Sequence, residues 1–298
     1  VSGTGVRADR KEEETYVQVK TEDARGEIQT EELGWTEYLV GILAEDLPRD
    51  TEHEAVKAQA VLVRTSLYQT LSKEDKTLES DYLTRGEMQE KWGLSDYQEI
   101  YDSYVQAVEE TDNLVLWYED GYPWVPFHQS SNGMTRSAEE VTGSKDYPYI
   151  AAKECPLDKE AEDEIQVFSF GYSEIQEKCR DFLVAAEGED EARQGYSFED
   201  FEIQSRDSSG YVQKLRIGKT VCTGDQFRDA LSLPSSDFSF SEDGNKMKIT
   251  TSGKGHGLGM SLWTANEMAK EGKTCEEILN FFFEGTSLKN DVQESDLI

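Results

Sequence analysis

The stretch TEHEAVKAQAVLVRTSLYQTL (residues 51–71) has the most regular helical pattern in the chain. Its alanines make a slim helix that can pack closely against its neighbours. Steps of three and four residues keep to one side of a helix, so one face consists of Lys57, Val61, Arg64 and Tyr68. The preceding stretch GWTEYLVGILAEDLPRD (34–50) also has helical spacing and stops at Pro48. We therefore expect two consecutive helices here.

The surrounding segments add strands and further helices. YVQVK (16–20) alternates apolar and polar residues, as a strand does. After residue 200, short alternating segments separated by glycine turns indicate antiparallel strands: YVQKLRIG (211–218), DFSFSE (237–242) and KMKITTSG (246–253). Acidic loops and then one amphipathic helix, SDYQEIYDSYVQAVEET, are expected over 71–112, and two helices over 264–271 and 274–285.

A hairpin is the third kind of element that the pattern indicates. The apolar residues 113–118 precede the turn EDGY, and residues 125–128 form the expected return strand. Residues 131–146 read as loop, and residues 187–200 as an acidic surface insertion. Strands and helices alternate without regular βαβ units, so the sequence predicts an α+β fold.

The charge of the chain excludes several classes of partner. It has 298 residues, with 62 acidic and 30 basic side chains and a net charge of −32. Nucleic acids and anionic lipids need a basic surface, so we expect neither as a partner. Glycans remain open as partners.

No membrane-spanning stretch of about 18 apolar residues occurs. The chain begins at Val1, so we expect any membrane contact to go through an anchor absent from this sequence.

The cysteines and histidines do not form a metal motif. Four cysteines are widely spaced with no CxxC pair, and we favour buried thiols over disulfides in a domain of this size. The histidines, His53, His128 and His256, lack HxxxH or HExxH spacing. We expect no metal and no cofactor.

Two loops have unusual composition. SGKGHGLGMS (252–261) alternates glycines, which let the backbone approach another group closely and present His256 to a cleft. A tight connection beneath a helix is an equally good interpretation. FHQSSNGMT (127–135) is either a sugar-binding loop rich in hydroxyls and amides or an ordinary polar turn.

Four segments resemble the SpoIID/LytB family. YLVGILAEDLP and EAVKAQAVLVRTSLY are similar to its YVxGVVAxEMP and EALKAQAVAARTY patterns. FHQSSNGMTRSAEEVTG, CTGDQFRDALSLPSSDFSF and GKGHGLGMSLWTANEMAKEGKTCEEILNFFFEGTSL resemble the later blocks of the family in the same order. Together the blocks cover residues 36–70, 112–158, 202–238 and 253–288.

The resemblance implies one family domain over residues 16–288, with insertions at 71–111 and 159–200 and tails at 1–15 and 289–298. It implies helices and short antiparallel strands around one long cleft. The implied activity is that of a peptidoglycan lytic transglycosylase, which cleaves the β-1,4 bond between N-acetylmuramic acid and N-acetylglucosamine and forms 1,6-anhydro ends. The alternative is a catalytically impaired, LytB-like module that binds glycan or enhances an amidase.

The resemblance also implies where and with what the protein acts. The expected setting is cell-wall remodelling during sporulation and engulfment. The expected partners are glycan strands and a cell-wall amidase. We expect an extracytoplasmic protein that faces the cell wall and is anchored or secreted in its full-length form.

The catalytic position departs from the family pattern. The family has one Glu two residues before its proline, and Asp46 occupies that place here, with Glu45 before it. Because the sugar's own 6-hydroxyl is the nucleophile, one carboxyl can act as acid and then base. Asp is one methylene shorter, so three outcomes stay open: Asp46 serves with an adjusted backbone, Glu45 serves through a register change, or activity is lost.

The same resemblance suggests residues that bind substrate. Lys57 and Arg64 match a basic pair of the family's second helix, although an ion pair with Glu54 or Asp50 is the alternative. The other residues expected to line the groove are His128, Ser131, Gly133, Thr135 and His256.

Overall fold

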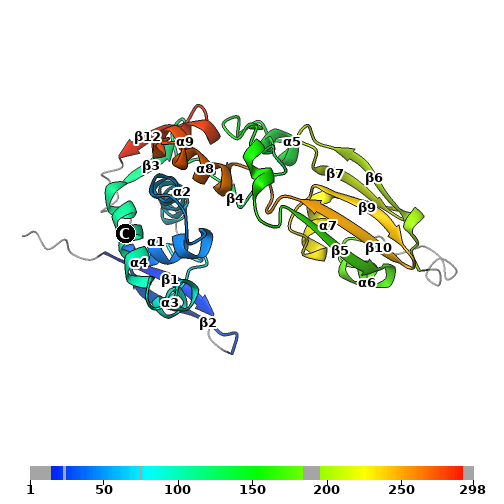
Figure 1. Ribbon diagram of the computed structural model, residues 1–298, viewed down its shortest axis with the longest axis horizontal. Helices are drawn as coiled ribbons and strands as arrows, with labels where there is room; N and C mark the ends of the chain where they lie inside the picture. The colour runs from blue at the N-terminus through cyan, green and yellow to red at the C-terminus, as the bar shows by residue number, and fades with distance from the viewer. Residues whose placement is uncertain (1–14, 23–24, 74–75, 184–194, 291–298) are drawn as a thin grey trace, which may run out of the picture. The chain divides into compact units, whose positions relative to one another are not determined.

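The computed structural model of the protein describes residues 15–22, 25–73, 76–183 and 195–290. Helices and short, mostly antiparallel sheets alternate along them (Figure 1), which confirms the predicted α+β class. Residues 1–14 of the expected tail at 1–15, and most of residues 187–200 and 289–298, lie outside the described residues. The chain divides into two compact units.

The first unit contains the two N-terminal helices. Among the described residues, it consists of those up to Asp50, those of Gln59–Val115, and Lys289 and Asn290. Its elements are β1 (Tyr16–Glu22), β2 (Ile28–Gly34), α1 (Trp35–Asp46), α2 (His53–Leu71) from Gln59 onward, α3 (Arg85–Trp92) and α4 (Tyr97–Glu110). β1 and β2 form an antiparallel hairpin in which Val17 and Val19 are buried, so the predicted strand is confirmed.

Helix α3 corrects the prediction that acidic loops fill the start of the 71–112 segment. Its sequence, RGEMQEKW, buries only Met88 and Trp92, too few apolar residues for a visible periodicity. A capping box formed by Thr84 and Glu87 fixes its start.

The second unit, Thr51–Ala58 with Leu116–Leu288, contains two three-stranded antiparallel sheets. One sheet has the order β5–β10–β9 and the other β6–β7–β8 (Figure 1). Both sheets and the helices α6 and α7 contribute to one hydrophobic cluster, which includes Phe227, Met247 and Ile249. The bounds are β5 (Ile165–Gly171), α6 (Tyr172–Lys178), η2 (Phe198–Asp200), β6 (Phe201–Arg206), β7 (Val212–Ile217), β8 (Thr220–Thr223), α7 (Gly224–Leu231), β9 (Phe238–Asp243) and β10 (Lys246–Ser252).

The remaining elements surround the two unusual loops. They are β4 (Phe127–His128), α5 (Ala138–Thr142), η1 (Pro156–Glu160), β11 (Met260–Ser261), α8 (Leu262–Lys270) and α9 (Cys275–Phe282). The helices predicted near 264–271 and 274–285 are thus confirmed as α8 and α9. The short α5 lies within the 131–146 segment that was expected to be loop.

The predicted hairpin over 113–128 is wrong. Tyr118 and Gly121 do exchange the hydrogen bonds of a turn. However, β3 (Leu114–Trp117) pairs with β12 (Ser287–Asn290), and β4 pairs in parallel with β11. Each strand therefore pairs with a segment far along the chain rather than with its neighbour.

The four cysteines are free and buried, as predicted. Burial raises the pKa of the Cys155 and Cys179 thiols to about 12. Thiols with such pKa values are unreactive at neutral pH.

Candidate functional site

Asp46 is the last residue of α1, in the first unit. The helix ends there because Leu47, which precedes Pro48, adopts an extended conformation with ψ 140°. The Asp46 carboxylate is partly buried, and its Oδ2 accepts a hydrogen bond of 2.9 Å from the amide of Gln59 on α2. Gln59 itself is fully buried. The two helices therefore hold this carboxyl in one orientation.

The surroundings of Asp46 favour its protonated form. Its pKa is raised from 3.8 to about 6, mainly by burial, with smaller contributions from the nearby charges of Glu45 and Asp81. The Gln59 hydrogen bond and the charge of Lys91 act in the opposite direction. A carboxyl with a pKa near 6 can both donate and accept a proton near neutral pH.

Lys91 of α3 caps the C-terminal end of α1. Its ammonium donates to the carbonyl oxygens of Ala44, Glu45 and Leu47. A cation at a helix C-terminus is favourable because the last carbonyls there have no partner in the helix. Glu45 is exposed, in contrast to the partly buried Asp46. Asp46 combines partial burial with a hydrogen bond from a fully buried donor, Gln59.

Arg64 does not occupy the exposed position expected of a substrate-binding residue, and this part of the prediction needs correction. Its side chain is 1% exposed, and its guanidinium donates to the carbonyl oxygens of Val108 and Leu114 and to the Thr111 hydroxyl, at 3.0–3.2 Å. Arg64 therefore fixes the end of α4 in the first unit. Lys57, in the second unit, forms a 2.8 Å ion pair with Glu54, the alternative that the sequence left open.

In the second unit, the two unusual loops lie against each other. Phe127 pairs with Met260 and His128 with Ser261 in the short parallel sheet, and bridges join Ser130 to Lys254 and Arg136 to Leu258. Each of the glycines at 253, 255, 257 and 259 has a positive φ. A Cβ on Gly259 would lie 1.9 Å from the Pro126 carbonyl oxygen, and one on Gly255 would lie 2.6 Å from the Cβ of His128. The alternating glycines thus permit close backbone approach, as one interpretation of the sequence required.

This packing brings His128 and His256 together, with their ring centroids 5.9 Å apart. The Nδ1 of His128 lies 3.0 Å from the Leu258 carbonyl oxygen and must donate to it, so the Nε2 of the neutral ring is an acceptor. The Leu258 N–H donates to Nδ1 of His256, so the proton of that ring is on Nε2. Burial lowers both pKa values to about 4, which keeps both rings neutral at pH 7.

Three other residues predicted to bind substrate belong to the 131–136 loop. Ser131 and Thr135 are fully buried. The Ser131 hydroxyl accepts from the Gly133 N–H, and the Thr135 hydroxyl accepts from the Lys153 N–H. Gly133 is partly exposed and has a φ of 104°. Gly133 and His256 are therefore exposed enough to contact a ligand directly. The buried residues Ser131, Thr135 and His128, which is 4% exposed, instead stabilise the loop.

Asp158 is a central residue of this site that the sequence interpretation missed. It is fully buried, and its carboxylate accepts from the Ser131 N–H and from the hydroxyls of Ser261 and Thr264, at 2.6–2.8 Å. Burial raises its pKa despite these bonds. The available signal was its place after Cys155-Pro156, in a segment that resembles a family block.

Arg136 is the central residue of a buried hydrogen-bond network that the sequence interpretation also missed. Its guanidinium donates to Asp207 at 2.7 Å, to Asp225 at 2.9 Å and to the His256 carbonyl oxygen at 3.2 Å, and it lies over the ring of Tyr211. This network connects the 131–136 loop, the glycine-rich loop and the α7 region. No local pattern predicts it, because its members are up to 120 residues apart.

Within the residues that the structure describes, no group of three or more His, Cys, Asp or Glu side chains is arranged to hold a metal ion. Among the same residues, no helix is both long enough and apolar enough to cross a membrane.

Comparisons with known proteins show which family the chain resembles. The family model described as Stage II sporulation protein (SpoIID) matches residues 23–118. The chain is 29% identical over 278 residues to stage II sporulation protein D of Bacillus amyloliquefaciens, covering 89% of this chain and 76% of that protein. It is 28% identical over 270 residues to stage II sporulation protein D of Bacillus subtilis (strain 168), covering 87% and 75%.

A third relative has no functional name. It is an uncharacterized protein of Brachyspira hyodysenteriae, 28% identical over 262 residues, with 86% of this chain and 67% of that protein covered. These matches show that the chain is similar to the SpoIID family, in agreement with the resemblance of its sequence blocks.

Proposed function

We propose that the protein acts in sporulation as a peptidoglycan lytic transglycosylase. It would cleave the β-1,4 bond between N-acetylmuramic acid and N-acetylglucosamine and leave a 1,6-anhydro end. Similarity to the SpoIID family and to stage II sporulation protein D supports the sporulation role. The observation that supports the chemistry best is the single carboxyl of Asp46, held by Gln59 and with its pKa raised to about 6.

One carboxyl of this kind is sufficient for the reaction. Asp46 in its acid form protonates the leaving glycosidic oxygen as the bond breaks. The carboxylate then accepts the proton of the 6-hydroxyl as that oxygen closes the anhydro ring. Because attack is intramolecular, its effective concentration is on the order of 10⁵ M or more, so the second carboxylate of a hydrolase is not needed.

The proposed substrate is the glycan strand of the cell wall, in an extracytoplasmic location. A cell-wall amidase is the proposed protein partner. Gly133, His256 and Lys57 are the proposed contacts among the residues that resemblance suggested, since each is at least partly exposed.

The test is digestion of purified peptide-free glycan followed by mass spectrometry of the ends. We expect 1,6-anhydro ends from the wild type and none from Asp46→Asn, with Glu45→Gln as the matched control that keeps activity. Ends that have gained water would contradict the transglycosylase mechanism. Loss of activity in Glu45→Gln instead of Asp46→Asn would assign the proton donor to Glu45.

A second candidate function is a glycan-binding or amidase-enhancing module without its own activity. It is favoured by the shorter reach of Asp46 compared with the family's Glu. In that case the wild type forms no anhydro ends, Asp46→Glu gains the activity, and Asp46→Ala leaves glycan binding unchanged.

A further inference from the structure

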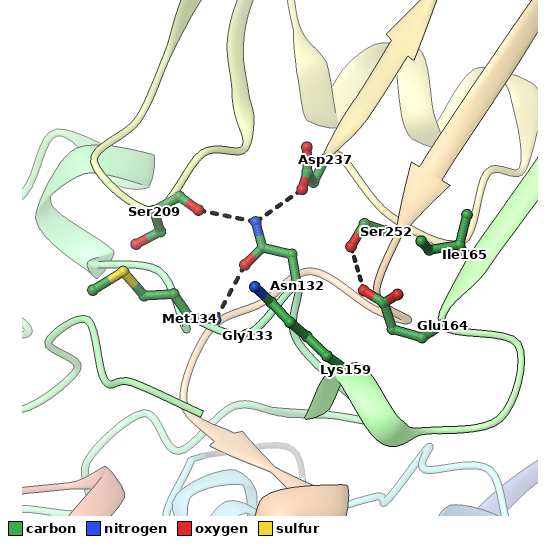
Figure 2. Close-up of a pocket in the computed structure, with 9 residues that line it drawn as sticks. All are labelled: Asn132, Gly133, Met134, Lys159, Glu164, Ile165, Ser209, Asp237 and Ser252. Carbon is green, nitrogen blue, oxygen red and sulfur yellow. Dashed lines mark hydrogen bonds between the residues drawn. The ribbon is translucent and has the colours of Figure 1, made fainter. Parts of the chain in front are cut away.

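A pocket of about 630 Å³ opens in the second unit, beside the 131–136 loop (Figure 2). None of the carboxyls considered for catalysis lines it. Its lining comes from several segments that are separate in the sequence: Asn132, Gly133, Met134, Lys159, Glu164, Ile165, Ser209, Asp237 and Ser252. A pocket of this size accommodates a small ligand.

Several polar groups of the lining are already paired within the protein. The Asn132 amide donates to the Ser209 carbonyl oxygen and to Asp237, both at 2.9 Å, and its oxygen accepts from the Met134 N–H (Figure 2). Asp237 also forms a 3.0 Å ion pair with Arg206. These residues make a rigid wall whose hydrogen bonds and charge are satisfied.

Glu164 differs from Asp237 in its pairing. The residue is 8% exposed, and one carboxylate oxygen accepts from the Ser252 hydroxyl. Among the described residues, no basic side chain lies within ion-pair distance of it. A carboxylate that is removed from most of its water and lacks a cation is unfavourable, so a cationic group entering the pocket would be stabilised there.

Lys159 supplies the opposite charge. Its side chain crosses Gly133, where an added Cβ would lie 2.5 Å from the lysine Cε (Figure 2). Lys159 and Glu164 do not form an ion pair with each other, nor does Lys159 form one elsewhere in the described part of the chain. The pocket therefore presents one cation and one anion separately, between the apolar side chains of Met134 and the 65% exposed Ile165.

We propose that this pocket binds a short zwitterionic peptide, about the size of a dipeptide. The carboxylate of the ligand pairs with Lys159 and its ammonium pairs with Glu164. Small apolar side chains of the ligand contact Met134 and Ile165. The pocket shares Gly133 with the proposed glycan contacts, but dipeptide binding requires neither Asp46 nor glycan cleavage, so a failure of the one proposal is distinguishable from a failure of the other.

The test is an NMR titration of the ¹⁵N-labelled protein with alanyl-alanine, its N-acetyl form and its C-terminal amide. We expect saturable shifts of the backbone amides of Gly133, Ser209 and Ser252, and roughly tenfold weaker binding when either end of the dipeptide is blocked. Lys159→Met should abolish the difference between the free acid and the amide. Glu164→Gln, which keeps the Ser252 hydrogen bond, should abolish the difference between the free and acetylated amine.

Lys145→Met is the matched control, because Lys145 is an exposed lysine of the same unit that does not line the pocket. It should change neither preference. The proposal is overturned if the dipeptide produces no saturable shifts. It is equally overturned if both blocked forms bind as well as the zwitterion, or if neutral N-acetylglucosamine oligomers shift the same amides and the dipeptide does not.

Discussion

At the scale of single residues, the raised pKa of Asp46 links stability to the proposed chemistry. The folded protein holds this carboxyl with a pKa of about 6, against 3.8 for an ordinary aspartate. The protonated form therefore stabilises the fold below pH 3.8, and this contribution is lost as the pH rises through about 6. At neutral pH the ionised carboxylate in this partly buried position lowers the stability of the fold. Acids with pKa values shifted in this way are common at catalytic sites.

Asp46→Asn should therefore stabilise the protein at pH 7.5 and have little effect at pH 4, because asparagine resembles the protonated form and can still accept from Gln59. We expect a gain of about 1–3 kcal/mol in the free energy of unfolding at the higher pH. Urea denaturation of both proteins at several pH values measures it. A difference that is independent of pH would contradict the raised pKa.

Loss of the Asp158 carboxylate should destabilise the second unit. Asp158→Ala leaves one N–H and two hydroxyls without their acceptor, in a region closed to water. We expect a loss of about 3 kcal/mol or more in the free energy of unfolding. The exposed Asp163, changed to Asn as a control, should have an effect below about 0.5 kcal/mol. Equal effects of the two substitutions in chemical denaturation would show that the Asp158 hydrogen bonds contribute nothing.

At the scale of elements, α2 shows what a helical pattern predicts and what it leaves open. The pattern indicated the helix and the common face of Lys57 and Arg64. It could not distinguish a partly exposed lysine from a buried arginine on that face, because this depends on the end of α4, where Arg64 donates to the Val108 carbonyl oxygen and the Thr111 hydroxyl. The hairpin failed for the same reason, since the partner of β3 is β12 near the other end of the chain.

Arg64→Met should destabilise the protein far more than Lys57→Met. Arg64 supplies buried hydrogen bonds to the end of α4, so we expect a loss of about 2–4 kcal/mol, whereas the partly exposed Lys57–Glu54 pair is worth about 0.5 kcal/mol. Thermal unfolding followed by circular dichroism compares the two. Arg64 would return to the list of substrate contacts if its replacement weakened glycan binding without changing stability.

At the scale of the whole molecule, the pattern of strands and helices without regular βαβ units predicted the α+β class, and the structure confirms it. The two loops of the candidate site were also recognised from their composition. The buried centres at Asp158 and Arg136 were not, because their hydrogen bonds join segments about 30 to 120 residues apart. The single long cleft remains a prediction.

The net charge of −32 should make stability dependent on salt. Like charges repel in the folded chain, and salt screens them beyond about 10 Å at 0.1 M ionic strength. We expect the melting temperature to rise by roughly a few degrees between 20 and 300 mM NaCl. A fall over this range would mean that ion pairs outweigh the repulsion.

The pH dependence of anhydro-end formation tests the role of Asp46 most directly. If Asp46 must be protonated to act, the rate at limiting glycan falls about tenfold per pH unit above pH 6, and Asp46→Asn forms no anhydro ends at any pH. A rate that stays constant from pH 5 to 8, or anhydro ends formed by Asp46→Asn at the wild-type rate, would contradict Asp46 as the proton donor.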